Sequence, residues 1–324
     1  MFKNHIKNGA WHDYVIFSLF AITLLGWLGA YHPILEIIPN IRMQLLGLAG
    51  FFALIAAIRS SPDSIVLATL IVAINFYYVS PYIFNNPNPV ASGVETFEIM
   101  QYNIYYDNND IKAIADHIIE ADSDVVVIHE LIAKQWQPLE LTLSKEYPYT
   151  HAEPFEHFEG QPSGGMAIIS KNPLSAIEVA DKYSPPDRKL LAATTVVGDQ
   201  EITIIGLHPH ASRFESRKIL LREAQIEAVV QLAKNSETAT IVATDMNITP
   251  LSPVYQNFLE DTGWQDPHKS VGWHPTWPAW RIPVGLPIDH VFVSNELTMH
   301  TYETGDGAGS DHKSLVATVS ISTD

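Results

Sequence analysis

Three long apolar runs occupy the first 84 residues and limit what this chain can fold into more than any other feature. Tyr14–Ala30 and Ser64–Phe84 contain no charged residue, and Met43–Ile58 is a shorter run of the same kind. A hydrocarbon core of about 30 Å requires roughly 20 apolar residues, with a lower limit of about 17. Consecutive runs without a polar face are hard to bury in a soluble domain, and two further runs exclude a simple signal peptide. We therefore predict three transmembrane helices within residues 1–84, in contact with the bilayer through residues 14–84.

The charges around these runs indicate how they cross the membrane. Lys3 and Lys7 precede the first run, and Arg59 lies in the short loop between the second and the third. The positive-inside rule puts both segments in the cytoplasm, and three crossings then put everything after Phe84 on the other side. Arg42, in the first loop, counts against this orientation. We expect a multi-pass protein of the cell (inner) membrane whose main domain is extracytoplasmic, that is, periplasmic.

The remainder of the chain is strongly acidic. Four of the 19 basic residues and three of the 36 acidic residues precede Glu95, which leaves 15 against 33 and a net charge of −18. Such a field repels polyanions and disfavours tight binding to duplex nucleic acid. A bound cation would reverse the sign locally, so a small phosphodiester is compatible with it. The absence of cysteine excludes thiolate metal sites, a cysteine nucleophile and disulfides.

Residues 96–324 have the pattern of one α/β domain, which follows a polar linker at residues 85–95. Helical periodicity covers Ile111–Ile119 and Arg213–Lys234. Short runs rich in β-branched residues predict seven buried strands: Phe97–Tyr102, Val125–Ile128, Met166–Ile169, Ile202–Leu207, Thr240–Ala243, Val291–Val293 and Leu315–Val319. Strands that alternate with helices indicate the α/β class.

Polar residues stand at the ends of these predicted strands. Taken singly, each has an ordinary explanation as a turn residue, a helix cap or a local hydrogen-bonding pair. Strand ends from distant parts of a chain can nevertheless converge on one rim of a sheet. The set comprises Asn103, Glu130, His208, Asp245, Asn247, Asp289, Asp311 and His312.

In their order along the chain, these segments resemble the endonuclease/exonuclease/phosphatase superfamily, which includes DNase-I-like nucleases, abasic-site endonucleases, neutral sphingomyelinases and inositol polyphosphate phosphatases. The matching segments run through residues 96–320: Ile99–Asn103, Asp124–Glu130, Gly164–Ser170, Gly206–His208, Ala243–Asn247, Pro287–Val291 and Gly309–His312. The resemblance implies a four-layer α/β sandwich of two packed mixed sheets flanked by helices. Three preceding transmembrane helices are similar to a bacterial membrane-anchored subgroup.

The resemblance also implies a metal site. Glu130 would be the principal ligand, with Asn103 and Asp311 nearby. Mg²⁺ prefers a few carboxylate or amide oxygens and retains several waters, so the implied cofactor is Mg²⁺ or Mn²⁺.

The remaining residues of the set would act on the phosphate ester. Asp245 would orient or deprotonate the attacking water, and Asn247 would hold a phosphate oxygen. His312, held by Asp289, would donate to the developing charge. His208 matches the position that helps to protonate the leaving group in the DNase and sphingomyelinase branches.

Some features depart from particular branches of the superfamily. Abasic-site enzymes carry an acidic residue where this chain has Tyr105. The tryptophan-rich segment Trp273–Trp280 is either a substrate-recognition loop or core packing. Inositol-phosphate enzymes need several bases around the substrate, and the plausible ones here are Arg188, Lys189, Arg213, Arg217 and Arg281.

The sequence thus predicts a membrane-anchored, metal-dependent phosphoesterase acting on a lipid headgroup or a small phosphate ester. Two alternatives stay open: an extracytoplasmic endonuclease or exonuclease, and a catalytically inactive, membrane-tethered binding module. A zinc metalloprotease is excluded because the chain lacks a His-x-x-x-His pair on a helix beside a glutamate.

Overall fold

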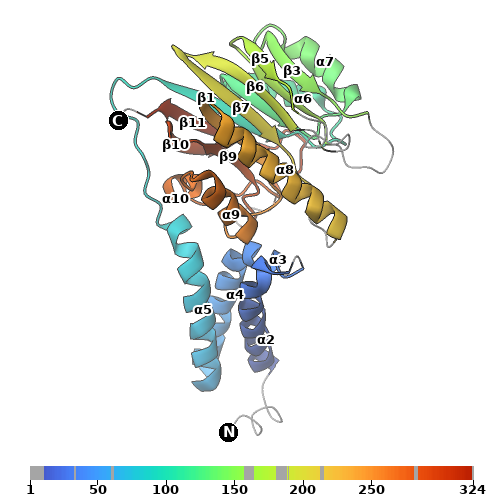
Figure 1. Cartoon of the computed structure of the whole chain (residues 1–324). Coiled ribbons are helices and arrows are strands. Elements are labelled where there is room, and N and C mark those ends of the chain that lie inside the picture. The colour runs from blue at the N-terminus through green and yellow to red at the C-terminus, as the bar shows by residue number, and fades with distance from the viewer. Residues whose placement is uncertain are drawn as a thin grey trace. The chain divides into compact units, whose positions relative to one another are not determined.

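A computed structural model describes residues 11–32, 34–59, 62–156, 164–179, 188, 190–211, 215–280 and 284–322 (Figure 1). The chain divides into two compact units. The helical unit comprises Met1–Phe84 with Pro250–Gln256, and the sheet unit comprises Asn85–Thr249 with Asn257–Asp324.

Among the described residues, three helices of the helical unit are long and apolar enough to cross a membrane: Trp11–Ala30, Arg42–Arg59 and Pro62–Ile83. The elements are α2 (Trp11–Leu25) continued by the 3-10 helix η1 (Gly26–Ala30), α3 (Ile37–Asn40), α4 (Arg42–Arg59) and α5 (Pro62–Ile83). The short predicted run Met43–Ile58 therefore lies wholly within one 18-residue helix.

Polar side chains join the three long helices of the helical unit. Asn75 of α5 donates from Nδ2 to Oγ1 of Thr23 in α2 at 3.1 Å, and Nη1 of Arg42 in α4 donates to its Oδ1 at 3.5 Å. The Arg42 guanidinium also lies 4.0 Å from the centre of the Tyr78 ring. Asn75, Thr23 and Arg42 are all buried. Because a buried polar group without a partner is costly, these contacts select which faces of the helices meet.

The sheet unit contains eleven strands among its described residues: β1 (Thr96–Asn103), β2 (Val125–His129), β3 (Tyr149–Glu153), β4 (Met166–Ser170), β5 (Leu174–Ile177), β6 (Leu190–Val197), β7 (Gln200–Leu207), β8 (Ala239–Asp245), β9 (Asp289–Val293), β10 (Leu297–Thr304) and β11 (Leu315–Ile321). They form a six-stranded sheet, in the order β10-β11-β1-β2-β4-β3, and a five-stranded sheet, in the order β5-β6-β7-β8-β9. The pairs β1–β2 and β7–β8 are parallel, and the other pairs are antiparallel.

Helices flank these two mixed sheets (Figure 1). The further helices are α6 (Ile111–Ala121), α7 (Ala133–Leu143), α8 (Ser216–Asn235), α9 (Pro253–Thr262) and α10 (Pro267–Val271). The predicted α/β sandwich of two mixed sheets with flanking helices is confirmed.

Two layers of apolar side chains hold the sheet unit together. Ile99 of β1 and Val127 of β2 belong to the core between the sheets, whereas Met100 and Val126 pack with residues of α6 and α7. Both faces of these strands are therefore buried. This explains why Val125–Ile128 is an unbroken apolar run rather than an alternating one.

The structure also contains strands that the sequence did not predict: β3, β5, β6 and β10. β3 (Tyr149–Glu153) has no fully buried residue, so it lacks the apolar run that marks the other strands. In the predicted linker, Asn85 donates from Nδ2 to the carbonyl of Ser270 at 2.8 Å, and Asn88 donates to that of Met299 at 3.2 Å. The start of the linker is therefore bound to the sheet unit.

Candidate active site

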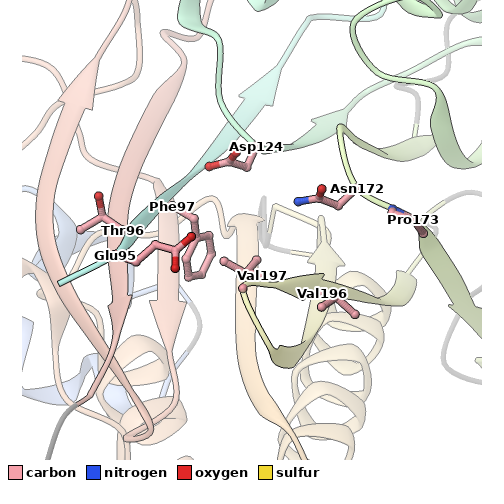
Figure 2. Close-up of a pocket in the computed structure, with 9 residues that line it drawn as sticks. Glu95, Thr96, Phe97, Asp124, Asn172, Pro173, Val196 and Val197 are labelled. Carbon is pink, nitrogen blue, oxygen red and sulfur yellow. The ribbon is translucent and has the colours of Figure 1, made fainter. Parts of the chain in front are cut away.

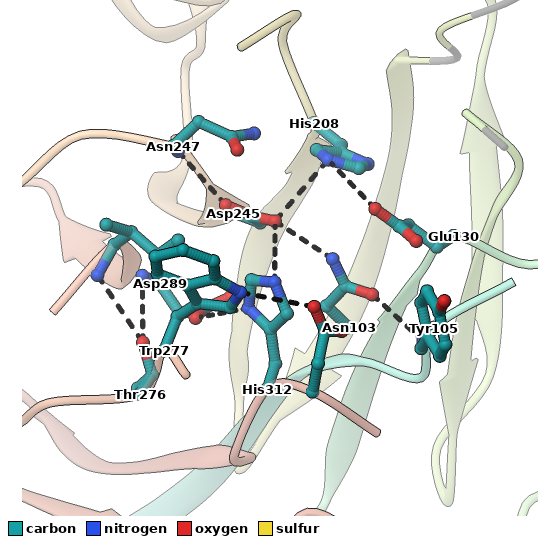
Figure 3. Close-up of polar contacts among 12 residues, drawn as sticks. Asn103, Tyr105, Glu130, His208, Asp245, Asn247, Thr276, Trp277, Asp289 and His312 are labelled. Atoms are coloured by element: carbon teal, nitrogen blue, oxygen red, sulfur yellow. Dashed lines mark hydrogen bonds and ion pairs between the residues drawn. The ribbon is translucent and has the colours of Figure 1, made fainter. Parts of the chain in front are cut away.

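Polar side chains gather where strands of both sheets end at one edge (Figure 3). Asn103 is the last residue of β1, Glu130 follows β2, and His208 follows β7. Asp245 is the last residue of β8 and pairs with Asp289, the first residue of the antiparallel β9. Parallel neighbours end at the same edge of a sheet, and in open α/β sheets ligands bind beyond the carboxyl ends of the strands.

Asp245 is the centre of this cluster. Its Oδ2 accepts a hydrogen bond from Nδ2 of Asn103 at 2.9 Å and lies 3.4 Å from Nε2 of His208 and 3.7 Å from Nε2 of His312. Its Oδ1 accepts from the backbone N–H of Asn247 at 3.0 Å. The side chain is almost fully buried. Three residues from distant parts of the chain, together with the nearby Asn247, thus converge on one carboxylate.

Residues with left-handed backbone surround the cluster. Glu130 has φ 59°, Tyr105 has φ 62° and Asn247 has φ 57°. A residue other than glycine rarely adopts this conformation, which costs about 1–3 kcal/mol and is typical of functional sites. The turn at Glu130 brings its carboxylate back toward the cluster, where Oε2 accepts from the N–H of Tyr106 at 3.4 Å.

Three side chains at this edge have the geometry of a cation site. Each offers one ligand atom, and these atoms lie within 4.8 Å of one another in the group of Glu130, His208 and Asp245. Burial raises the pKa of Glu130, and burial together with Asp289 raises the pKa of Asp245 to about 7. Crowded, desolvated carboxylates of this kind are stabilised in their ionised form by a divalent cation. The donor set, rich in carboxylate oxygen, fits the hard cation that the sequence implied.

The three predicted metal ligands differ in their surroundings. Glu130 belongs to the group just described, and Asn103 lies beside it, donating to Asp245 and accepting from the N–H of Tyr105 at 3.0 Å. Asp311 is not a member, and its Oδ2 accepts from the indole N–H of Trp277 at 3.1 Å. The assignment of Asp311 as a ligand stays a prediction.

His312 and Asp289 form a buried ion pair. Nδ1 of His312 lies 2.9 Å from Oδ2 of Asp289, whose Oδ1 accepts from Nε2 of Gln101 at 2.8 Å. Burial alone would lower the pKa of His312, but Asp289 and Asp245 outweigh it and raise that pKa to about 10. Burial likewise opposes ionisation of Asp289, yet His312 keeps its pKa below the ordinary value. The pair is therefore an imidazolium and a carboxylate at neutral pH.

A second cation, Arg188, occupies the other side of the cluster. Its Nη1 lies 2.8 Å from the ring nitrogens of His208, and its backbone carbonyl accepts from Nε2 of Gln225 at 3.0 Å. Burial and the Arg188 charge hold the pKa of His208 well below its usual range. His208 is therefore neutral, which favours a hydrogen-bonding role over the proton-donating role that the resemblance implied.

Four other bases were singled out in the sequence. Lys189, Arg213 and Arg281 lie outside the described residues, and Arg217 is exposed on α8. Arg188 was one of five plausible bases in the sequence. Its contact with His208 in the structure is what marks it as part of the site. Asn247 lies at the rim, where its Nδ2 donates to the carbonyl of Pro209 at 3.4 Å.

A pocket of about 400 Å³ lies elsewhere in the sheet unit (Figure 2). Its lining includes Glu95 and Phe97 at the start of β1, Asp124 just before β2 and Asn172 just after β4. These are the opposite ends of the strands from Asn103. The pocket is therefore separate from the polar cluster.

Comparison with known proteins agrees with this geometry. The model of the Endonuclease/Exonuclease/phosphatase family matches residues 100–312, which contain all eight polar residues singled out in the sequence. The chain belongs to this family. Members are hydrolases that act on phosphate esters. No match is found among curated proteins.

Solved structures of other family members share the fold. An endonuclease/exonuclease/phosphatase protein from Beutenbergia cavernae is 21% identical over 70% of this chain and 72% of its own, with a TM-score of 0.57. A humanized D. rerio TDP2 is 18% identical over 69% and 98%, with a TM-score of 0.54. Sphingomyelinase C from Streptomyces griseocarneus is 18% identical over 69% and 99%, with a TM-score of 0.50. At these identities the likeness concerns the fold alone.

Proposed function

We propose that this family member is a membrane-anchored, Mg²⁺- or Mn²⁺-dependent phosphoesterase that hydrolyses lipid headgroups or small phosphate esters outside the cytoplasm. The observation that carries the proposal is the buried group of Glu130, His208 and Asp245, with the His312–Asp289 ion pair against it. A binding module has no need of a buried imidazolium–carboxylate pair that faces further carboxylates, and burying such charges is costly.

The site would divide the work of hydrolysis among its own residues. Glu130, with Asp245 and His208 beside it, would hold the cation. A bound divalent cation supplies charge neutralisation for the non-bridging phosphate oxygens. Asp245, the carboxylate at the centre of the cluster, would orient an attacking water and accept its proton.

The two cations of the protein would act on the phosphate. His312 is held as an imidazolium by Asp289, so it can donate a hydrogen bond to the negative charge that develops on phosphorus-bound oxygen. Arg188, on the other side of the cluster, would support phosphate binding there, and the neutral ring of His208 lies against its guanidinium.

Charge and the three apolar helices support the choice of substrate. The net charge of −18 after Glu95 opposes binding to a polyanion, whereas a single headgroup phosphate needs only the few cations of the site. Helices long enough to cross a membrane would keep the site near lipid. One of the proteins with a similar fold is a sphingomyelinase, which supports a lipid phosphodiester as the substrate.

The test is a substrate panel with the full chain in lipid nanodiscs and Mg²⁺. Phospholipids, inositol phosphates, RNA and DNA are compared under the same conditions, with a Glu130→Ala protein as the matched blank. Release of headgroup or phosphate by the parent alone is expected. Activity on nucleic acid only would replace the lipid substrate with a nuclease function, and inactivity on every class would leave a binding module.

A further inference from the structure

Backbone hydrogen bonds to two neighbouring segments hold the segment that contains Trp277 in place. Its backbone N–H donates to the carbonyl of Leu286 at 3.0 Å and its carbonyl accepts from the N–H of Leu286 at 2.6 Å. The N–H of Ala279 donates to the carbonyl of Asp311 at 2.8 Å, and the N–H of Lys313 donates to the carbonyl of Thr276 at 2.9 Å. The tryptophan backbone is thus held in register with the strand-end segment that carries Asp311.

The indole then makes a specific contact with Asp311. Its Nε1–H donates to Oδ2 of that carboxylate at 3.1 Å. Within the described part of the chain, no hydrogen bond reaches Oδ1 of Asp311. An indole N–H is a donor only, so it engages one carboxylate oxygen and cannot accept a proton from it. The contact therefore fixes the carboxylate by a single oxygen.

Asp311 is flanked in the chain by two residues that contact the cluster. Nε2 of His312 lies 3.7 Å from Oδ2 of Asp245, and Oγ of Ser310 donates to the carbonyl of Asn103 at 2.7 Å. A carboxylate on a surface loop has freedom about two torsions, and ordering it at a cation site costs conformational entropy. A partner that orders it beforehand lowers that cost.

We propose that Trp277 is a positioning residue that orders Asp311 toward the cation site by binding Oδ2 and leaving Oδ1 for the cation or its waters. The proposal rests on the proposed metal-dependent function. Partners that orient metal-ligating carboxylates typically contribute about 10–100-fold to metal affinity, which sets the size of the expected effect.

The chain offers a matched control for this tryptophan. Trp280 lies three residues further along the same segment, its side chain is 67% exposed, and it makes no hydrogen bond within the described residues. Trp277→Phe and Trp280→Phe make the same chemical change, because each removes an indole N–H and keeps an aromatic ring. Only the first breaks a contact with Asp311.

The experiment measures Mn²⁺ binding to the full chain in detergent micelles, without substrate, by electron paramagnetic resonance of the free ion. We expect Trp277→Phe to raise the Kd for Mn²⁺ about 10-fold or more and Trp280→Phe to leave it unchanged. Equal Kd values for both variants and the parent would overturn the proposal. So would tighter binding by Trp277→Phe, because the indole would then be withholding Asp311 from the cation.

A double-mutant cycle separates positioning from a general loss of structure. Asp311→Asn and the Trp277→Phe/Asp311→Asn pair should bind Mn²⁺ equally, because the tryptophan acts through that carboxylate. Additive losses would mean that Trp277 supports the fold instead, and would overturn the proposal. If the parent itself bound no Mn²⁺, both this proposal and the proposed metal-dependent function would fail. If only the double-mutant cycle failed, the proposed function would still stand.

Discussion

The ion pair between Asp289 and His312 makes a sharp prediction for Asp289→Asn. Asparagine has almost the same shape as aspartate, so it removes the charge while leaving the packing near Gln101 intact. The difference between the ordinary pKa of His312, 6.5, and about 10 corresponds to roughly 5 kcal/mol of preference for the imidazolium. Removing one partner of a buried ion pair typically destabilises a protein by about 3–5 kcal/mol, which is of the same size.

Without Asp289, burial opposes the imidazolium with only Asp245 and Asp311 left against it, so the pKa of His312 should fall. The site then lacks one donor for the developing phosphate charge, which typically lowers kcat by about 10²–10³-fold. The loss should appear in kcat rather than in KM, because the interaction strengthens in the transition state. Asp124→Asn is the control, because it makes the same chemical change at the other end of the strands. Asp124 lies just before β2 and accepts a hydrogen bond from the backbone N–H of Glu98, near the end of β1 opposite to Asn103.

The pH dependence follows from the same pair. Because the folded-state pKa of His312 is raised to about 10, the protonated histidine contributes fully to the stability of the protein below pH 6.5. This contribution is lost as the pH rises from 6.5 through about 10. Asp289, whose pKa is lowered, contributes above its unfolded-state pKa and loses that contribution as the pH falls through its folded-state value. The parent should therefore keep the imidazolium across neutral pH, and Asp289→Asn should lose it at much lower pH.

The assay is kcat against pH for the parent, Asp289→Asn, His312→Ala and the double variant. If Asp289 acts by holding His312, the double variant should be little slower than His312→Ala. Fully additive losses, or a His312 ring that titrates near 6.5 in the parent by nuclear magnetic resonance, would refute this reasoning.

Two further predictions concern orientation and substrate. A reporter fused after Asp324 should behave as extracytoplasmic, with alkaline phosphatase active and green fluorescent protein dark, because Lys3 and Lys7 precede an odd number of candidate spans; the reverse pattern would mean an even number of crossings. At fixed salt and Mg²⁺, kcat/KM should be higher for a phospholipid or headgroup diester than for duplex DNA, because 15 basic residues are dispersed among 33 acidic ones after residue 95; a clear preference for DNA would favour the nuclease alternative.

The strands that carry the site were visible in the sequence because they are buried on both faces. Val125–Ile128 and Ile202–Leu207 lie inside the sandwich. The unbroken apolar run of the first and the mostly apolar run of the second marked the strands that lead to Glu130 and His208. β3, with no fully buried residue, and β10, which mixes polar and apolar residues, carried no such run and were missed.

Contacts between distant residues could not be predicted in this way. Arg188 lies 20 residues from His208 in the sequence, and no periodicity links them, yet burial and this contact together hold the pKa of the histidine well below its usual range. The bond between Trp277 and Asp311 joins residues 34 apart, so the sequence left the tryptophan segment between core packing and substrate recognition. The protonation state and the hydrogen-bond partners of a side chain depend on residues from distant parts of the chain, whereas the end of a strand is marked by the local sequence pattern.

The most direct test of the metal-dependent phosphoesterase is hydrolysis of a small chromogenic phosphodiester by the full chain after treatment with EDTA. We predict that EDTA abolishes hydrolysis, that Mg²⁺ or Mn²⁺ restores it, and that Glu130→Ala stays about 10²–10³-fold slower at saturating metal, because Glu130 belongs to the group that would hold the cation. Full activity in EDTA, or a Glu130→Ala protein as fast as the parent, would contradict the account.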